Sequence, residues 1–207
     1  MKYEWRKQDK TIYLPKNKPE FIDVPSFNFL TIEGEGNPNG SDFQNYIQAL
    51  YALSYTIKMT LKKGNSMKNY QDYTVFPLEG VWDINDKAKK HYTGTLNKDD
   101  LVFKLMIRQP NFMTLEYFEE MQQAAIEKKQ LPLLSHVNFE VITEGPSVQM
   151  LHIGPYDDEP ESFQKMETFA VEQGYQSVSK IHREIYLSDF RKVAPEKLKT
   201  VLRFGVK

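Results

Sequence analysis

Hydrophobic and polar positions follow two different periods along the chain, and together they predict alternating strands and helices. Apolar residues alternate with polar ones over about residues 21–34, which is typical of a strand with one buried face. Over about residues 42–62 the apolar positions recur every three or four residues, which predicts an amphipathic helix. Lys62, Lys63 and Gly64 suit its end, because cations favour a helix C-terminus and glycine adopts the left-handed conformation found there.

The same two periods predict two more helices and several more strands. One helix runs from about Thr114 to Lys129, and the other begins near Asp157 and ends before Gly174. The inward face of the first of these is expected to consist of Leu115, Phe118, Met121 and Ala125. Strands are expected at 73–84, 101–109, 137–144, 147–153, 177–187 and 200–206.

Two stretches of the chain resemble each other. Residues 29–51 and 150–172 both run from a strand through a turn-rich loop into a helix that begins at a Phe-Gln pair. Two strand-like segments follow each helix, so the order β-α-β-β occurs twice. We therefore predict an α+β fold in which two pseudo-symmetric βαββ halves form a curved antiparallel sheet, with helices on one face and a ligand groove between the halves.

The domain organisation follows from this repeat. Residues 1–20 are polar and are expected to form an N-terminal arm. Residues 21–207 are expected to form a single domain. Its first half spans about 21–110, a linking helix about 114–130, and its second half about 137–207.

Composition narrows the class of protein. The net charge is −1 and Lys and Arg are spread along the chain, whereas nucleic-acid binders usually carry a basic stripe, so we expect no direct nucleic-acid binding. There is no cysteine, which excludes disulfides and thiolate metal sites. The N-terminus lacks the apolar stretch of a signal peptide, and no apolar run approaches the ~20 residues of a membrane span. We therefore expect a cytoplasmic protein without a membrane partner.

The strand predicted around residue 184 carries the best candidate chemistry. His182, Glu184 and Tyr186 alternate with apolar residues, so they should share one face, and the opposite face should lie under the helices. Trp82 aligns with Tyr186 in the repeat, which would bring an indole, a phenol and a carboxylate to one groove. Such a carboxylate can act as a base, since burial raises its pKa, or can attract a cationic ligand. The alternative is an exposed Glu on a sheet.

The other candidates are weaker. His152 lies on a predicted strand, where a lone His is more often a core or pocket-lining residue than a ligand. The four histidines lack metal-ligand spacing, so we expect no metal site. No organic cofactor is expected either. Glu79 is out of phase with Trp82 and is expected to face away from the groove unless a bulge occurs at Gly80.

The chain resembles the GyrI-like small-molecule-binding domain family, within the wider SOUL/effector-binding superfamily, and specifically its long stand-alone branch. The segments that carry the resemblance are MLHIGPYDDEPESFQKMETFA (150–170), HREIYLSD (182–189), APEKLKTVLR (194–203) and YTVFPLEGVWD (73–83). The resemblance implies a groove that binds bulky, flat and often cationic or aromatic compounds. It also implies a central glutamate on the late strand, and Glu184 is the matching residue.

The resemblance leads to a specific functional prediction. Some members of the family hydrolyse cyclopropane-bearing DNA-alkylating compounds, and this chain is expected to capture flat electrophiles and open such rings with water. Glu184 and Tyr186 are the expected catalytic residues. The expected ligand-binding residues are Trp82, Tyr55, Phe112, Tyr117 and His152. Two alternatives stay open: a non-catalytic multidrug-binding, sequestering or sensor module, and a protein that protects DNA gyrase.

Overall fold

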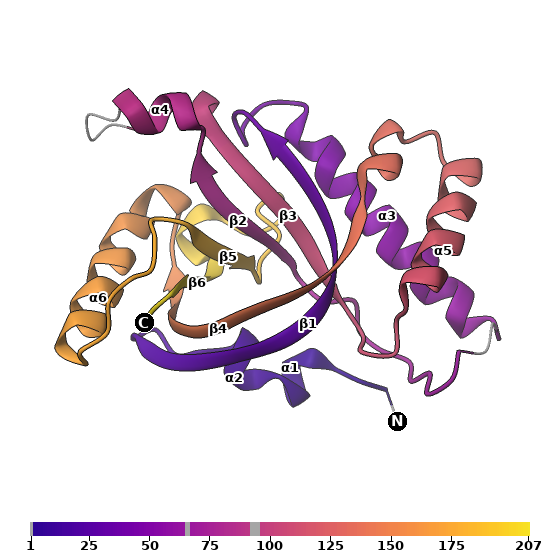
Figure 1. Cartoon of the computed structure of the whole chain (residues 1–207), viewed down its shortest axis with the longest axis horizontal. Coiled ribbons are helices and arrows are strands. Elements are labelled where there is room, and N and C mark those ends of the chain that lie inside the picture. Colours follow the sequence, from indigo (N-terminus) through magenta and orange to yellow (C-terminus); the bar gives the residue numbers. More distant parts are fainter. Residues whose placement is uncertain (1, 65–66, 92–95) are drawn as a thin grey trace. The chain divides into compact units, whose positions relative to one another are not determined.

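The computed structural model describes residues 2–64, 67–91 and 96–207 (Figure 1). The chain divides into two compact units. Unit 1 comprises Met1–Glu4, Phe27–Phe76 and Trp82–Ile142, and unit 2 comprises Trp5–Ser26, Pro77–Val81 and Thr143–Lys207. Three strands contribute residues to both units: β1 (Glu20–Glu35), β2 (Leu78–Ile84) and β4 (Asn138–Ile153).

The strands form an antiparallel sheet, as the sequence predicts, within a mixed α+β fold. The other three strands are β3 (Leu101–Gln109), β5 (His182–Tyr186) and β6 (Lys199–Gly205). The hydrogen-bonded order is β1-β3-β2-β5-β6-β4 and closes on itself, so the sheet is a barrel rather than an open curved sheet. Closure gives each strand a neighbour on both sides and removes the unpaired edges that an open sheet exposes.

Unit 1 is organised around helix α3 (Phe43–Lys62), which packs against β3 and against helix α5 (Leu115–Lys128). The sequence-based prediction of both helices is confirmed, and Gly64 has the expected positive φ of 105°. The inward face predicted for α5 is wrong at Leu115, which is 54% exposed. Leu115 is the first helical residue after the cap at Thr114, and Tyr117 occupies the buried position of that turn instead.

Strand β1 ends at Glu35, close to the limit near residue 34 that the sequence predicts. Gly34 pairs with Phe103 of β3 in the antiparallel register. A Cβ atom at Gly34 would lie 2.5 Å from the Phe103 ring and 2.8 Å from the Tyr46 ring. This glycine therefore makes room for two aromatic rings and does not form a turn.

Unit 2 is organised around helix α6 (Glu159–Glu172), which packs on β4 and β6. Its helix end is also as predicted, since Gly174 has a positive φ of 80°. The buried side chains that join these elements are Val148, Met150, Met166, Ala170, Leu202, Phe204 and Val206. Because alternate residues of a strand face opposite ways, this cluster identifies the face of β4 and β6 that α6 covers.

Short helices complete the two units. The predicted N-terminal arm contains α1 (Trp5–Gln8) and α2 (Lys10–Tyr13), and its Trp5 and Tyr13 side chains are buried. The remaining elements of the described residues are α4 (Asp86–His91) and the 3₁₀ helices η1 (Lys98–Asp100), η2 (Pro132–His136), η3 (Tyr156–Asp158) and η4 (Pro195–Lys197). Several predicted strand limits differ: β2 begins at Leu78, β4 is one continuous strand, and β5 is only five residues long.

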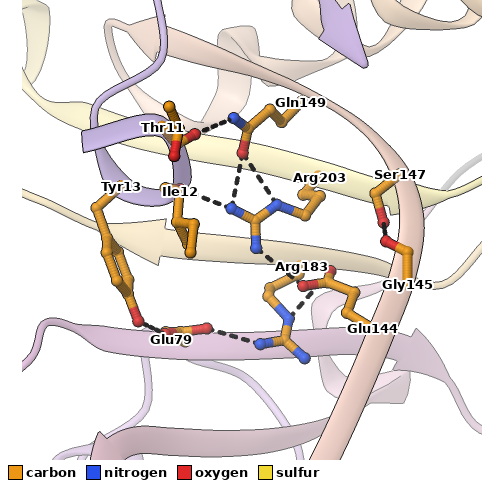
Figure 2. A network of polar contacts seen from close by, with 10 residues as sticks. All are labelled: Thr11, Ile12, Tyr13, Glu79, Glu144, Gly145, Ser147, Gln149, Arg183 and Arg203. Carbon is orange, nitrogen blue, oxygen red and sulfur yellow. Dashed lines mark hydrogen bonds and ion pairs between the residues drawn. The ribbon is translucent and has the colours of Figure 1, made fainter. Parts of the chain in front are cut away.

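A buried polar network lies on the face of β4, β5 and β6 opposite α6 (Figure 2). Arg203 donates to Oε1 of Gln149 from Nε at 3.1 Å and from Nη2 at 2.7 Å, and its Nη1 donates to Glu144 at 2.8 Å. Arg203 also donates to the backbone oxygen of Ile12, and Gln149 donates to that of Thr11. The N-terminal segment is thereby attached to the sheet through side-chain hydrogen bonds to its backbone.

The second arginine of this network is Arg183 of β5. Its Nη1 donates to Oε2 of Glu79 at 2.8 Å, and its Nε lies 3.3 Å from Oε1 of Glu144. Tyr13 donates to the other oxygen of Glu79 at 3.1 Å. Buried charges of this kind are tolerated only when paired, and here two arginines balance two glutamates.

Candidate functional site

Glu184 lies on the face of β5 that α6 covers. It is directly opposite Leu202 in the β5–β6 register, and Leu202 belongs to the apolar cluster beneath α6. The ring of Phe163 in α6 meets the His182 ring at 4.7 Å. The prediction that Ile185, rather than Glu184, faces the helix is therefore wrong. Arg183 and Ile185 occupy the opposite face. Arg183 lies directly opposite Arg203 in the register, and Arg203 belongs to the polar network on the face away from α6.

The side chains expected to share a face with Glu184 do contact it. Nε2 of His182 lies 3.1 Å from Oε1 of Glu184, and the Tyr186 hydroxyl donates to Oε2 at 2.8 Å. Glu184 is nearly buried, with 9% of its surface exposed, whereas His182 and Tyr186 are partly exposed. Both carboxylate oxygens are thus held in place by neighbours on the same strand, two residues away on either side.

Glu159, the first residue of α6, adds a second carboxyl group to this site. It is 5% exposed and its carboxyl group hydrogen bonds to that of Glu184. Burial, followed by the charge of Glu184, that hydrogen bond and the charge of Asp157, raises the pKa of Glu159 to about 10. At neutral pH Glu159 is therefore the protonated member of the pair, and it donates to Glu184.

Aromatic rings border the two carboxyl groups. Tyr156 of η3 meets Tyr186 edge to face, with ring centroids 6.0 Å apart, and Phe163 meets His182 in the same way. Burial, together with the charges of Glu184, Glu159 and Asp189, raises the pKa of Tyr156 to about 12, so its hydroxyl stays neutral. The arrangement combines one negative charge with neutral aromatic donors, which suits a flat ligand that is polar or positively charged.

His152 of β4 has partners for both ring nitrogens within unit 2. Nε2 lies 3.1 Å from the Pro155 carbonyl oxygen and Nδ1 lies 2.9 Å from the Ser162 hydroxyl. The carbonyl oxygen only accepts, so Nε2 carries the proton and the Ser162 hydroxyl donates to Nδ1. His152 is 4% exposed. These contacts join β4 to the first turn of α6, which carries Glu159.

Trp82 belongs to unit 1 and lies in an aromatic cluster. Its ring is 5.4 Å from Phe103 and 5.8 Å from Phe43, and Phe43 in turn meets Phe103 edge to face at 5.1 Å. Trp82 is 6% exposed. Its surroundings in unit 1 are those of a packed side chain.

The other three aromatic residues that the sequence suggested as ligand contacts also lie in unit 1. Tyr55 is 51% exposed on α3 and stacks with Tyr51 at 6.3 Å. Phe112 meets Tyr70 and Tyr73 edge to face, at 5.7 and 6.1 Å. Tyr117 is buried on α5. Tyr55 is thus on the surface of unit 1, while Phe112 belongs to an aromatic cluster.

The sequence suggested neither Glu159 nor Tyr156 as a site residue. Residues 157–160 suggested only the beginning of a helix, because acidic residues and proline favour that position. The spacing from Glu159 to Glu184 is 25 residues, and no local pattern connects them. Glu79 was expected to face away from the site, and it is buried against Arg183 and Tyr13.

Two further findings concern metal ions and membranes. Within residues 2–64, 67–91 and 96–207, no three His, Asp or Glu side chains are grouped so that they could hold a metal ion. Of the helices described, none is both long and apolar enough to span a bilayer.

Comparison with known families identifies the class of protein. The family model of the GyrI-like small molecule binding domain matches residues 17–207. The chain therefore belongs to the GyrI-like family of small-molecule-binding domains, as its resemblance suggested. A comparison with curated proteins gave no match.

Solved structures agree with this assignment. A hydrolase from Listeria innocua is 36% identical, with a TM-score of 0.88 and coverage of 99% of this chain and 100% of that one. Another structure of a hydrolase from Listeria innocua is 37% identical, with a TM-score of 0.90 and full coverage of both chains. The C-terminal domain of EcmrR is 14% identical, with a TM-score of 0.53 and coverage of 95% and 98%, which shows a shared fold.

Proposed function

We propose that this chain captures flat aromatic electrophiles at Glu184 and hydrolyses compounds in which a cyclopropane ring is conjugated to a carbonyl. The observation that carries the proposal is the pair of contacts on Glu184, whose carboxylate accepts hydrogen bonds from Tyr186 and His182. A carboxylate acts as a base and a phenol as a hydrogen-bond donor, and hydrolysis of this kind needs both. The similarity to proteins described as hydrolases supports a hydrolytic reaction.

The proposed reaction uses water as the nucleophile. The water oxygen bonds to a cyclopropane carbon as a carbon–carbon bond of the ring breaks, and that electron pair moves into the conjugated carbonyl, which becomes a phenolate. Glu184 takes the proton that the water loses. Tyr186 turns its hydroxyl from Glu184 to the developing phenolate oxygen, which frees Oε2 of Glu184 for the proton. Transfer of that proton to the phenolate restores the carboxylate.

The protonated Glu159 supports this role of Glu184. Because the shared proton is on Glu159, the negative charge of the pair is on Glu184, which must be unprotonated to act as a base. General-base catalysis contributes roughly 10²–10⁴-fold, so binding and positioning have to supply the rest of the acceleration. Tyr156 and Phe163 are proposed to contact the flat part of the ligand beside the acids.

We also propose that the residues suggested by the sequence contact the ligand. Trp82, Tyr55, Phe112 and Tyr117 would supply aromatic surface for the polycyclic part of the ligand, and His152 would act from beside Ser162. No metal or organic cofactor is required by the proposed step.

The second candidate function is binding without turnover. A buried carboxylate beside Tyr156, Tyr186 and Phe163 is also the arrangement that attracts an aromatic cation, through charge and cation–π contacts. In that case the chain sequesters or senses drugs and the ligand is recovered unchanged. Protection of DNA gyrase is a further alternative.

The experiment measures the ring opening of a cyclohexadienone that carries a spiro-cyclopropane ring. The compound is incubated with limiting protein in ¹⁸O-labelled water. The wild-type protein should release many equivalents of ring-opened product that contains one labelled oxygen. Glu184→Gln should lower the rate by roughly 10²-fold or more, the scale of a lost general base, and Glu161→Gln, which removes an exposed carboxylate of α6, should not. Quantitative recovery of intact compound would reject hydrolysis and favour binding alone.

A further inference from the structure

The carboxyl groups of Glu159 and Glu184 share a proton, which neither candidate function by itself requires. Glu159 and Glu184 come from different elements, α6 and β5, and their carboxyl groups are in hydrogen-bond contact. Oε1 of Glu159 is buried, and no donor group of the described residues reaches it. No Lys or Arg within the described part of the chain forms an ion pair with Glu159. The contact between the two acids therefore depends on a proton held by the pair.

We propose that the Glu159–Glu184 pair exchanges its shared proton for a positively charged ligand, so that the same site accepts neutral flat electrophiles with the proton in place and aromatic cations with the proton released. The proposal deepens the proposed function and rests on it in one respect, namely that ligands bind at Glu184. It assigns Glu159 as a ligand-facing residue of that site.

The physical reason is charge balance in a nearly buried site. Two carboxylates in contact cannot both be ionised without a compensating positive charge. In the free protein that charge is the proton. An aromatic cation beside Glu184 supplies the same compensation, so it lowers the proton affinity of Glu159 and the proton leaves to solvent. A neutral ligand supplies no charge, and the proton stays.

The other ionisable groups near the pair do not replace the proton. Tyr156 and Asp157 of η3 and Asp189 after β5 are neutral or negative and so add no positive charge. Tyr186 contributes a neutral hydroxyl, and His152 shares its ring nitrogens with Ser162 and Pro155. His182 is hydrogen-bonded to Glu184, and a positive charge on its ring would be the one competing compensation. The Glu159→Gln variant distinguishes the two sources of positive charge, the proton of the carboxyl pair and the His182 ring.

The experiment is calorimetric titration with two probes of nearly the same shape. One is 10-methylacridinium, a flat cation that has no ionisable proton, and the other is 10-methylacridone, which is neutral. Each is titrated into the full chain at pH 7.5 in phosphate and in Tris, whose ionisation enthalpies differ. The difference in measured heat between the buffers gives the number of protons released per ligand bound.

The wild-type protein should release close to one proton with 10-methylacridinium and none with 10-methylacridone. Between pH 7 and pH 8.5 the affinity for the cation should rise by about tenfold per pH unit, the slope for one released proton. Glu159→Gln keeps a donor to Glu184 but holds no titrating proton, so it should bind the cation without proton release and with a flat pH profile. Glu161→Gln, the matched control, should behave as the wild type.

Three results would overturn the proposal: a cation that binds the wild type without releasing a proton, proton release that persists in Glu159→Gln, or failure of the cation to bind where the neutral probe binds. The wild-type titration in two buffers decides the matter even if Glu159→Gln does not fold. If neither probe binds and no ring-opened product forms, the proposed function fails as well. Binding of the neutral probe alone leaves the proposed function in place and rejects only the proton exchange.

Discussion

Arg183 and Glu79 form an ion pair in which both side chains are almost completely buried, with Nη1 of Arg183 donating to Oε2 of Glu79 at 2.8 Å. Arg183 immediately precedes Glu184 in β5, so the two residues point to opposite faces of the strand. One face carries the paired cation of the buried network (Figure 2), and the other carries the candidate acid.

Glu79→Ala should destabilise the protein by about 3–5 kcal/mol, the cost of leaving one partner of a buried ion pair unpaired. Arg183 would lose this charge partner although Glu144 remains beside it, and the Tyr13 hydroxyl would lose Glu79 as an acceptor. The free energy of unfolding from urea denaturation measures the effect. Glu167→Ala is the control, because the Glu167–Lys180 pair is exposed and should contribute nothing measurable. Equal stability of the two variants would mean that water replaces the pair in the folded protein.

Glu144 should make the protein sensitive to acid. Burial opposes its ionisation, but the charges of Arg203 and Arg183 outweigh burial and lower the pKa of Glu144 below its ordinary value of 4.5. The unfolded state therefore binds the proton more readily, so the stabilisation is present above about pH 4.5 and is lost as the pH falls through the folded-state pKa. Urea denaturation between pH 7 and pH 3 should show this loss. Glu144→Gln should be less stable at pH 7 and should depend less on pH in this acid range.

Glu159 should have the opposite effect on stability. Its pKa is raised in the folded protein, so the folded state holds a proton that the unfolded state releases. Stability from this group is complete below the unfolded pKa of about 4.5 and declines as the pH rises towards the folded-state pKa of about 10. Glu159→Gln removes this dependence, so its stability relative to the wild type should increase steadily from pH 5 to pH 9 in urea denaturation. A constant difference across that range would show that Glu159 does not carry the proton.

Trp82→Ala should destabilise the protein by about 3–5 kcal/mol, the range for a buried large side chain replaced by alanine. Trp82 is 6% exposed and its ring packs against both Phe43 and Phe103. The sequence suggested instead that Trp82 lines a groove, and for a side chain partly open to solvent the loss would be smaller. Urea denaturation separates the two cases. Ligand affinity of the folded fraction of this variant then tests the proposed contact between Trp82 and the ligand.

The sequence indicated the elements and the main site residues through local patterns. The helical period gave α3, α5 and α6, and glycines with positive φ end α3 and α6 as expected. Strand alternation put His182, Glu184 and Tyr186 on one face, and their hydrogen bonds show that they share it. These features depend on residues within a few positions of one another, so the sequence alone determines them.

Tertiary structure decided everything that depends on which segments meet. Alternation shows that Glu184 and Ile185 face opposite ways, but not which of them faces α6, because that depends on the pairing of β5 with β6. The proximity of Glu159 to Glu184 depends on where the first turn of α6 meets β5, and the burial of Arg203 depends on the N-terminal segment. Charge, burial and proton sharing are properties of groups brought together in space, so the pKa of Glu159 and the closure of the sheet follow only from the folded chain.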